Sequence, residues 1–358
     1  MNSVINRNSP SASGVAWASQ ERQAQFDSWL TPLVQSYNLA VHTLAPASSD
    51  ASFRRYLRIH TRDQASSFII MDAPPEHENV APFIQVASLM HKARLHAPQI
   101  YAADEARGFL LLNDLGNELY LAALTQATPA QAHELMCAAI DALVQWQVGV
   151  DAQTLPPYDE SVLKRELDLF PQWCVEAEFG MQWNDAQKAA WDRVSQRLMN
   201  SALAQPRVAV HRDWMPRNLM IAQPNPAILD FQDAAYGPIT YDIASLLRDA
   251  FISWDEEREI DWAVRYWEQA RSAGLPVQED FGTFWQALEW MGLQRHLKVL
   301  GVFCRLKHRD GKPRYSTDLP RFFAYATKVI LRYQELAPLL ALIEPLSGMK
   351  TENGYTLR

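Results

Sequence analysis

Three oxygen-bearing side chains near the middle of the chain have a spacing that suits phosphoryl transfer. His211, Asp213 and Asn218 form the pattern H-x-D-x-x-x-x-N, and Asp230 follows twelve residues after Asn218. A random chain of this composition would contain the first pattern about 0.02 times. A polar turn between strands is the alternative, but it would have this spacing only by accident. We therefore predict that these residues carry the chemistry.

Phosphoryl transfer asks the protein to position a nucleophile and to neutralise charge on the phosphates of a nucleotide. Asp213 is the predicted base, because one carboxylate must orient the acceptor hydroxyl and take its proton. Magnesium prefers hard oxygen ligands, so Asn218 and Asp230 are the predicted ligands of the Mg²⁺ that accompanies ATP. We assign His211 a structural role within the loop. Arg217 directly precedes a metal ligand and is assigned to ATP.

These residues resemble the catalytic loop and the metal-binding motif of the kinase-like fold. The closer resemblance is to the aminoglycoside phosphotransferase family of small-molecule kinases, whose motif does not require a glycine at the position of Gln232. The segment 241–247 is similar to the family's next helix, and the resemblance implies that Asp242 braces the catalytic loop. It also implies an α+β, two-lobed protein-kinase-like fold, with a small strand-rich N-lobe and a larger, mainly helical C-lobe.

Further segments resemble the bacterial anomeric sugar kinases of cell-wall recycling. They are residues 50–56, 71–76, 166–171, 294–301 and 309–312. This resemblance implies a phosphotransferase with an alcohol group as acceptor, which uses ATP to phosphorylate the C1 hydroxyl of N-acetylmuramate or N-acetylglucosamine. A kinase for another small alcohol, such as an aminoglycoside or choline, is one alternative. A nucleotide-binding pseudokinase without turnover is the other.

The N-terminal part lacks the lysine that typically holds the α- and β-phosphates in this fold, and it also lacks the glutamate that pairs with that lysine. The expected third strand, 67–72, contains no lysine, and the helix after it offers Gln85 in place of a glutamate. An arginine is therefore the predicted substitute, and the candidates are Arg54, Arg55, Arg58, Arg212 and Arg217. Of these, Arg54 and Arg55 follow a loop of small residues that could bind phosphate through backbone N–H groups. The alternative is that both are ordinary strand residues. The predicted ATP contacts are Ser52, Arg54, Arg55, Asp114 and Arg217.

A sugar acceptor requires carboxylates that accept from hydroxyl groups and an aromatic ring. Glu166 is the acid that we expect to face the sugar, although a solvated charged face explains the same helix. Arg295 belongs to a polar cluster in an otherwise apolar helix, and it either contacts an acceptor carboxylate or joins an interhelical network. The predicted acceptor contacts are Glu166, Asp168, Trp214, Gln232 and Arg295.

The elements that must position these residues are strand-rich at first and helical afterwards. Apolar runs predict strands at 41–44, 55–60, 67–72 and 109–113, with helices around 22–37 and 80–95. Long helices are expected from Thr128, which begins a capping box. The later ones are expected at about 161–178, 185–204, 241–252, 256–272, 281–306 and 319–335. Residues 207–231 interrupt them as a strand, a loop and a hairpin. We predict a disordered tail at 1–20, an N-lobe at 21–116 and a C-lobe at 117–358.

The composition limits the partners and the compartment. The chain has 358 residues, 48% of them apolar, and a net charge of −8 with no polybasic run, so we do not expect nucleic acid as a partner. Only three cysteines are present, far apart, which excludes a disulfide framework and a thiolate zinc site. No stretch is long and apolar enough to span a membrane. We expect a cytoplasmic monomer whose partner is a small amino sugar.

Overall fold

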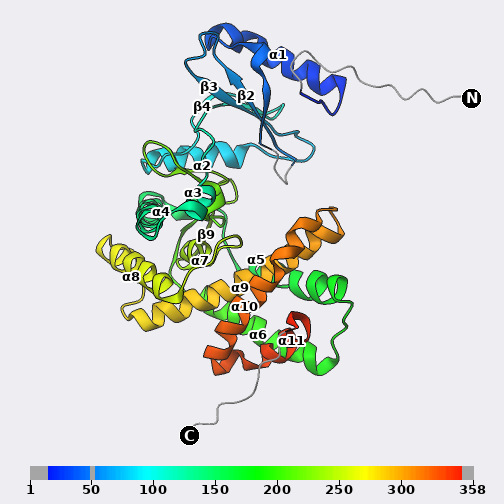
Figure 1. Ribbon diagram of the computed structural model, residues 1–358, viewed down its shortest axis with the longest axis vertical. Helices are drawn as coiled ribbons and strands as arrows, with labels where there is room; N and C mark the ends of the chain where they lie inside the picture. Colours follow the sequence, from blue (N-terminus) through cyan, green and yellow to red (C-terminus); the bar gives the residue numbers. More distant parts are fainter. Residues whose placement is uncertain (1–14, 49–52, 349–358) are drawn as a thin grey trace, which may run out of the picture. The chain divides into compact units, whose positions relative to one another are not determined.

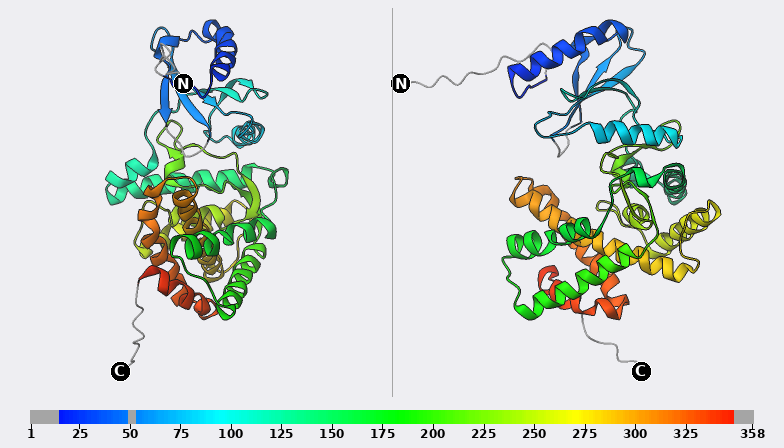
Figure 2. Two further views of the ribbon diagram at one scale, coloured as in Figure 1. Left: turned by 90° about the vertical axis from the view of Figure 1, so that its right-hand side faces the viewer. Right: turned by 180° about the vertical axis from the view of Figure 1, so that it is seen from behind.

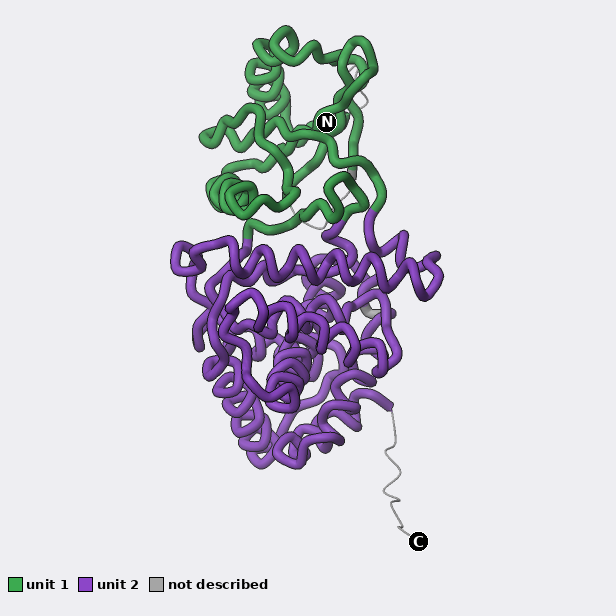
Figure 3. The backbone as a smooth tube through the Cα atoms, turned by 90° about the vertical axis from the view of Figure 1, so that its left-hand side faces the viewer, with its two compact units in different colours: residues 1–118, 220–232 green, residues 119–219, 233–358 purple. Residues whose placement is uncertain are grey.

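The chain divides into two compact units (Figure 3). The computed structural model describes residues 15–48 and 53–348. Unit 1 takes residues 1–118 and 220–232, and unit 2 takes residues 119–219 and 233–358. Within unit 1, the described residues make a five-stranded antiparallel sheet, two α-helices and β8 (Ala227–Ile228), which belongs to a separate two-stranded hairpin, and unit 2 is mainly helical.

The segment 220–232, which we expected in the C-lobe, belongs to unit 1. The backbone N–H of Ile228 donates to the carbonyl of His96 at 2.8 Å, and the His96 ring contacts the carbonyl of Pro224 at 2.6 Å. The ring of Phe231 packs against Phe83, with 4.7 Å between the ring centroids. Because of these contacts, residues 220–232 pack with unit 1, although in the sequence they lie between two segments of unit 2.

Five antiparallel strands form the sheet of unit 1 in the order β1-β2-β3-β5-β4 (Figure 1). They are β1 (Ala45–Ser48), β2 (Arg55–His60), β3 (Ser67–Asp72), β4 (Ile100–Asp104) and β5 (Phe109–Asn113). The predictions for β2, β3 and β5 are confirmed. The prediction of a strand at 41–44 is wrong, because Val41–Thr43 is a 3₁₀ turn in which Val41 is exposed and only the following Leu44 is buried.

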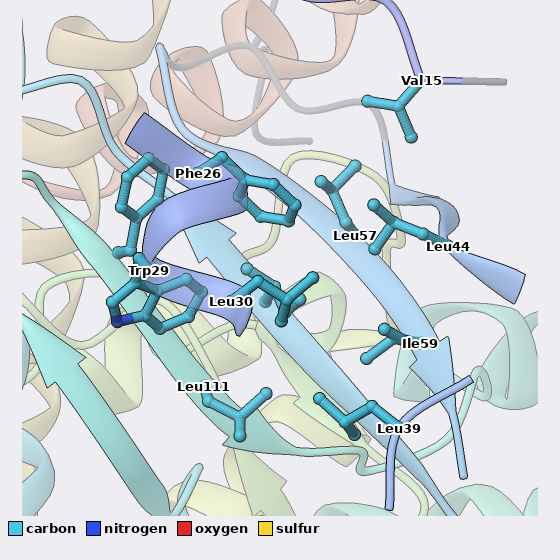
Figure 4. Packing of buried hydrophobic residues seen from close by; sticks show 11 residues of the cluster. Val15, Phe26, Trp29, Leu30, Leu39, Leu44, Leu57, Ile59 and Leu111 are labelled. Atoms are coloured by element: carbon cyan, nitrogen blue, oxygen red, sulfur yellow. The ribbon is translucent and has the colours of Figure 1, made fainter. Parts of the chain in front are cut away.

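The helix α1 (Gln20–Ser36) lies across one face of this sheet (Figure 2). Its Phe26, Trp29 and Leu30 recur at helical spacing and are all buried. Figure 4 shows them with Leu57 and Ile59 of β2, in a cluster that also includes Leu111 of β5. Because strand side chains alternate between the two faces, residues 55, 57 and 59 of β2 all face α1.

A buried aspartate joins α1 to the sheet. Asp72, at the end of β3, is completely buried and lies opposite Arg55 in the β2–β3 register. Its Oδ1 accepts from Arg22 Nη2 of α1 at 2.6 Å, and its Oδ2 accepts from Arg55 Nε at 3.0 Å. The Arg22 guanidinium also lies over the ring of Phe109, 3.9 Å from its centroid. One carboxylate thus fastens a helix and two strands together.

Unit 2 is built mainly of helices. They are α3 (Tyr120–Gln126), α4 (Pro129–Gly149), α5 (Glu160–Leu167), α6 (Asp185–Leu203), α7 (Tyr241–Leu247), α8 (Glu256–Ser272), α9 (Phe281–His308), α10 (Leu319–Arg332) and α11 (Ala337–Ser347). The capping box at Thr128 is confirmed. The strands β6 (Arg207–Val210) and β9 (Ala235–Pro238) pair antiparallel in this unit. None of the helices among the described residues is apolar over a length that could cross a bilayer.

Two of the expected helices differ from the structure. The helix expected at 161–178 is divided into α5 and a π-helical segment, Phe170–Glu178, which has Pro171 in its first turn. Proline has no N–H and disfavours an α-helical residue before it, which accounts for the break. The helix expected at 241–252 ends at Leu247 as α7, and a loop follows. At the long helix α9, a Cβ atom on Gly301 would lie 2.4 Å from the backbone of Leu169, so only glycine fits there.

The buried contact of Asp72 leads to a stability prediction. We expect Asp72→Asn to lower the free energy of unfolding by about 3 kcal/mol, because it leaves two guanidinium groups without their carboxylate. Urea unfolding measures this. The matched control is Arg107→Gln, which removes a partly exposed ion pair with Asp104 and is expected to cost less than about 1 kcal/mol. Equal effects of the two substitutions would show that Asp72 does not hold unit 1 together.

Candidate active site

The loop 211–218 of unit 2 connects β6 to a short 3₁₀ turn, Pro216–Asn218. His211 is completely buried, and its Nδ1 accepts the backbone N–H of Asp213 at 3.2 Å. The ring of Trp214 meets the His211 ring edge to face, with 5.4 Å between centroids. These contacts are those of a residue that shapes the loop, which is the role that we expected for His211.

Asp242 holds the start of this loop from α7. Its Oδ2 accepts the backbone N–H of His211 at 2.6 Å, and its Oδ1 accepts the backbone N–H of Arg212 at 2.9 Å. Burial raises the pKa of Asp242 to about 7, although the two N–H groups and the nearby Arg295 act to lower it. The backbone of Arg212 has a φ of 77°, in the left-handed region that favours glycine. The carboxylate therefore supports a strained conformation.

Asn218 is fastened to the residue that we predict to be the base. Its Nδ2 donates to the carbonyl oxygen of Asp213 at 3.0 Å, so the amide oxygen is the atom that Asn218 can offer to a cation. Asp230, in unit 1, has a φ of 59° and accepts from Gln232 Nε2 at 2.9 Å. Residues with left-handed backbone cluster at functional sites, and both Arg212 and Asp230 show it.

The oxygen donors suit magnesium bound with a nucleotide. Among the described residues, no group of three or more His, Cys, Asp or Glu side chains could hold a metal ion by itself. One amide oxygen and one carboxylate are hard ligands, and an octahedral Mg²⁺ would take its other ligands from phosphates and water. Each of these two side chains is thus of a type that magnesium binds.

Glu166 lies in a buried polar cluster next to the loop. Its Oε1 accepts from Arg212 Nη2 at 2.7 Å and from Lys298 Nζ at 2.9 Å. Its Oε2 accepts a short hydrogen bond from the Tyr158 hydroxyl and a longer one from Gln294 Nε2 at 3.4 Å. Both oxygens are thus engaged by the protein. The interhelical network that we considered for the polar cluster of α9 is present.

Charge keeps Glu166 ionised in spite of its burial. Burial acts to raise the pKa of Glu166, but Lys298 and Arg212 outweigh it and lower the pKa to about 2. Burial likewise acts to lower the pKa of Lys298, and Glu166 raises it above its usual range. The Lys298 Nζ also donates to the Tyr241 hydroxyl at 3.2 Å. The carboxylate and both cations are therefore charged together at neutral pH.

The other predicted acceptor contacts lie in different surroundings. Asp168 is exposed and pairs with Lys164 at 2.9 Å, so it does not join Glu166. Trp214, a residue of the loop, is completely buried, and its place in the acceptor site stays a prediction. Arg295 is 5% exposed, with its guanidinium 5.0 Å from the ring centroid of Tyr241. Gln232 contacts the predicted metal ligand Asp230.

The predicted ATP contacts are divided between several partners. Ser52 lies outside the described residues. Arg54 pairs with Glu78 at 3.2 Å, and Arg55 belongs to the buried contact with Asp72. Asp114 accepts from Arg58 Nη2 at 2.9 Å, from Ser67 Oγ at 2.6 Å and from the backbone N–H of Gly116 at 3.0 Å. Arg217 lies 5.2 Å from the ring centroid of Phe251.

Sequence reasoning did not find two residues of the cluster around Glu166. Tyr158 and Tyr241 are completely buried, and their rings pack edge to face at 5.2 Å between centroids. Each hydroxyl bonds to a charged group of the cluster. The only sequence signal for Tyr241 is its position directly before Asp242. Nothing in the sequence distinguishes Tyr158 from the other tyrosines.

The chain is similar to named proteins over most of its length. A relative in Pseudomonas putida is 54% identical over 86% of this chain and 89% of its own length, and one in Neisseria meningitidis is 46% identical over 94% and 99%. Both are named N-acetylmuramate/N-acetylglucosamine kinase. An ethanolamine kinase of Plasmodium vivax has the same fold, with a TM-score of 0.60 at 11% identity over 94% of this chain and 93% of its own.

The described architecture is therefore a protein-kinase-like fold, with a small antiparallel sheet in the N-lobe and a mainly helical C-lobe, as expected. The model of one family, described as "Phosphotransferase enzyme family", matches residues 43–281. This match covers more than half of the sequence and contains the loop, the hairpin and α7. The chain belongs to this phosphotransferase enzyme family.

Proposed function

We propose that the protein is an ATP-dependent kinase that phosphorylates the anomeric C1 hydroxyl of N-acetylmuramate, N-acetylglucosamine or both. Membership of the phosphotransferase family and the names of the relatives in Pseudomonas putida and Neisseria meningitidis support it. The single observation that carries it is the geometry of the loop 211–218. In this loop the Asn218 side chain donates a hydrogen bond to the Asp213 carbonyl, and Asp242 accepts the backbone N–H of His211. We further propose that it acts as a cytoplasmic monomer in peptidoglycan recycling.

Each residue of the loop has a role in the proposed reaction. Asp213 orients the C1 hydroxyl and accepts its proton as the oxygen attacks the γ-phosphorus of ATP, while the bond from that phosphorus to the β–γ bridging oxygen breaks and ADP leaves. Asn218 and Asp230 would hold a magnesium ion, which would supply positive charge to neutralise the phosphates of ATP. Arg217, adjacent to Asn218, is assigned to the phosphates as well. His211 and Asp242 keep the loop in its conformation.

On the nucleotide side we propose that Arg54, and not Arg55, contacts the phosphates. Arg55 shares a face of β2 with Leu57 and Ile59, which pack against α1, and its carboxylate partner Asp72 is completely buried. Arg54 has the partly exposed Glu78 as its partner. The Glu78 side chain is 17% exposed, so water can reach it if Arg54 leaves, whereas Asp72 has no contact with water and would lose one of its cations if Arg55 left.

On the acceptor side we retain Arg295 as a candidate contact. It lies on α9 within the unit that contains Asp213, and an arginine suits the carboxylate that N-acetylmuramate carries on its lactyl group. Glu166 is not retained as a sugar contact, because both oxygens of its carboxylate already accept from side chains of the cluster.

The first test measures turnover. We expect the native protein to release ADP with one or both amino sugars and to give a product whose phosphate is on C1, which NMR identifies. Asp213→Asn should lower kcat by about two to four orders of magnitude, because the proton has no acceptor in the transition state. The KM for ATP should change little.

A panel of other alcohols completes this test. Aminoglycosides, choline and hexoses are offered to the native protein under the same conditions. Turnover of one of these with none of the amino sugars would refute the proposed acceptor and leave a kinase. An absence of turnover with every acceptor, in both the native protein and Asp213→Asn, would indicate a nucleotide-binding module.

The second test separates the two arginines. We expect Arg54→Ala to raise the KM for ATP by about tenfold, since a charge-assisted hydrogen bond to phosphate contributes about 1.5 kcal/mol or more. Arg55→Ala should instead lower the thermal unfolding temperature and leave the KM for ATP near its native value. Steady-state kinetics and thermal unfolding of both variants decide. The opposite assignment, a raised KM in Arg55→Ala only, would show that the β2 residue reaches the nucleotide.

A further inference from the structure

Arg212 occupies a backbone position at which glycine would be less strained. Its φ of 77° is left-handed, and a side chain there costs free energy that glycine avoids. Arg212 directly precedes the proposed base Asp213. An arginine that is retained next to a base at such a position requires a reason, and the contacts of its side chain supply one.

Arg212 is held at two points, its backbone by Asp242 and its guanidinium group by Glu166. Its backbone N–H donates to Asp242, and its Nη2 donates to Glu166 Oε1 at 2.7 Å. Glu166 is nearly buried, with 6% of its side chain exposed, whereas the side chains of Arg212 and Lys298 are 23% and 19% exposed. A buried carboxylate thus gathers two partly exposed cations onto one oxygen.

These contacts close into a ring that includes the loop. From Glu166, one path runs through Arg212 directly to the loop backbone. The other runs through Lys298 to the hydroxyl of Tyr241, whose neighbour Asp242 accepts both loop N–H groups. Both paths end at the residue that precedes the base. A ring of this kind restricts rotation of the loop about Arg212, because neither end of that residue can move alone.

We propose that Glu166, Arg212 and Lys298 are positioning residues, which set the direction of the Asp213 carboxylate through the Arg212 backbone. Glu166 in this assignment never touches the acceptor. The inference deepens the proposed function and rests on it, because the base is positioned for the transfer of phosphate to a hydroxyl. Orientation of a base within a fraction of an ångström affects the rate of the chemical step much more than the binding of substrate.

A different role for the same cations has to be distinguished from this one. Arg212 and Lys298 are partly exposed, and two cations side by side would also suit an anionic group on the acceptor. The two proposed acceptors separate these roles, since N-acetylmuramate carries a carboxylate and N-acetylglucosamine does not. A positioning role affects both sugars equally, whereas an anion subsite affects only the first.

The experiment compares Glu166→Gln, Arg212→Gly and Lys298→Met with the native protein on both sugars. We expect each to lower kcat by about 10- to 100-fold, by the same factor for both sugars, with KM values for sugar and ATP within about threefold. Arg212→Gly is the sharpest variant, because it relieves the backbone strain and still lowers the rate. The double variant Glu166→Gln/Arg212→Gly should be no slower than the slower single variant, since both act through one ring.

The matched control is Glu160→Gln, the same substitution at an exposed position of the same helix, α5, and its kcat should equal that of the native protein. Thermal unfolding with and without ATP verifies that each variant is folded and binds nucleotide. Native kcat in Arg212→Gly or Glu166→Gln would overturn the inference. A loss confined to N-acetylmuramate, or a rise in KM without a fall in kcat, would overturn it as well.

Failure of the proposed function has a separate signature. If the native protein phosphorylates neither sugar, the acceptor is wrong, and the same variants are then compared for hydrolysis of ATP by water. The positioning role predicts the same ratio of variant to native rate there, because water is activated by the same base. Equal rates of hydrolysis in the native protein and in Glu166→Gln would refute it.

Discussion

The geometry of the catalytic loop depends on one carboxylate. Asp242 accepts the backbone N–H groups of His211 and Arg212, and it does so from the first turn of a completely buried helix. A left-handed arginine is unfavourable in a free peptide, so the loop would adopt other conformations without this support. The bond from Asn218 to the Asp213 carbonyl acts on the other end of the same short segment. Asp213, the proposed base, therefore lies between two hydrogen-bonded ends.

Sequence patterns predicted those parts of the fold in which one local signal dominates. The runs 55–60 and 67–72 have the length and apolar content of strands, and the capping box at Thr128 specifies where a helix begins, so these agree with the structure. The patterns failed where tertiary contacts decide. Residues 41–44 are apolar at two positions, but only Leu44 has a core to enter, and the proline at 171 converts an expected long helix into two segments.

The candidate site shows the same limit. Spacing was enough to predict a shared role for Asp213, Asn218 and Asp230, because residues so close in the sequence form one pattern that can be recognised without the fold. The partner of a charged residue depends on folding, and Glu166 illustrates it: its cations are Arg212, forty-six residues away, and Lys298 on α9. In the sequence, a glutamate that binds a sugar and a glutamate that pairs with a buried cation look the same, since both are an acidic residue on one face of a helix. Only the positions of the neighbouring side chains distinguish the two.

The unusual N-terminal part follows from how its charges are paired. Each arginine around β2 has a carboxylate partner: Arg54 has Glu78, Arg55 has Asp72 and Arg58 has Asp114. A phosphate can replace a carboxylate only where the carboxylate can return to water at little cost. Asp72 is completely buried, so Arg55 cannot leave it without loss of stability. Glu78 keeps some contact with water, so the proposed transfer of Arg54 from its carboxylate to a phosphate would cost less than the same transfer of Arg55.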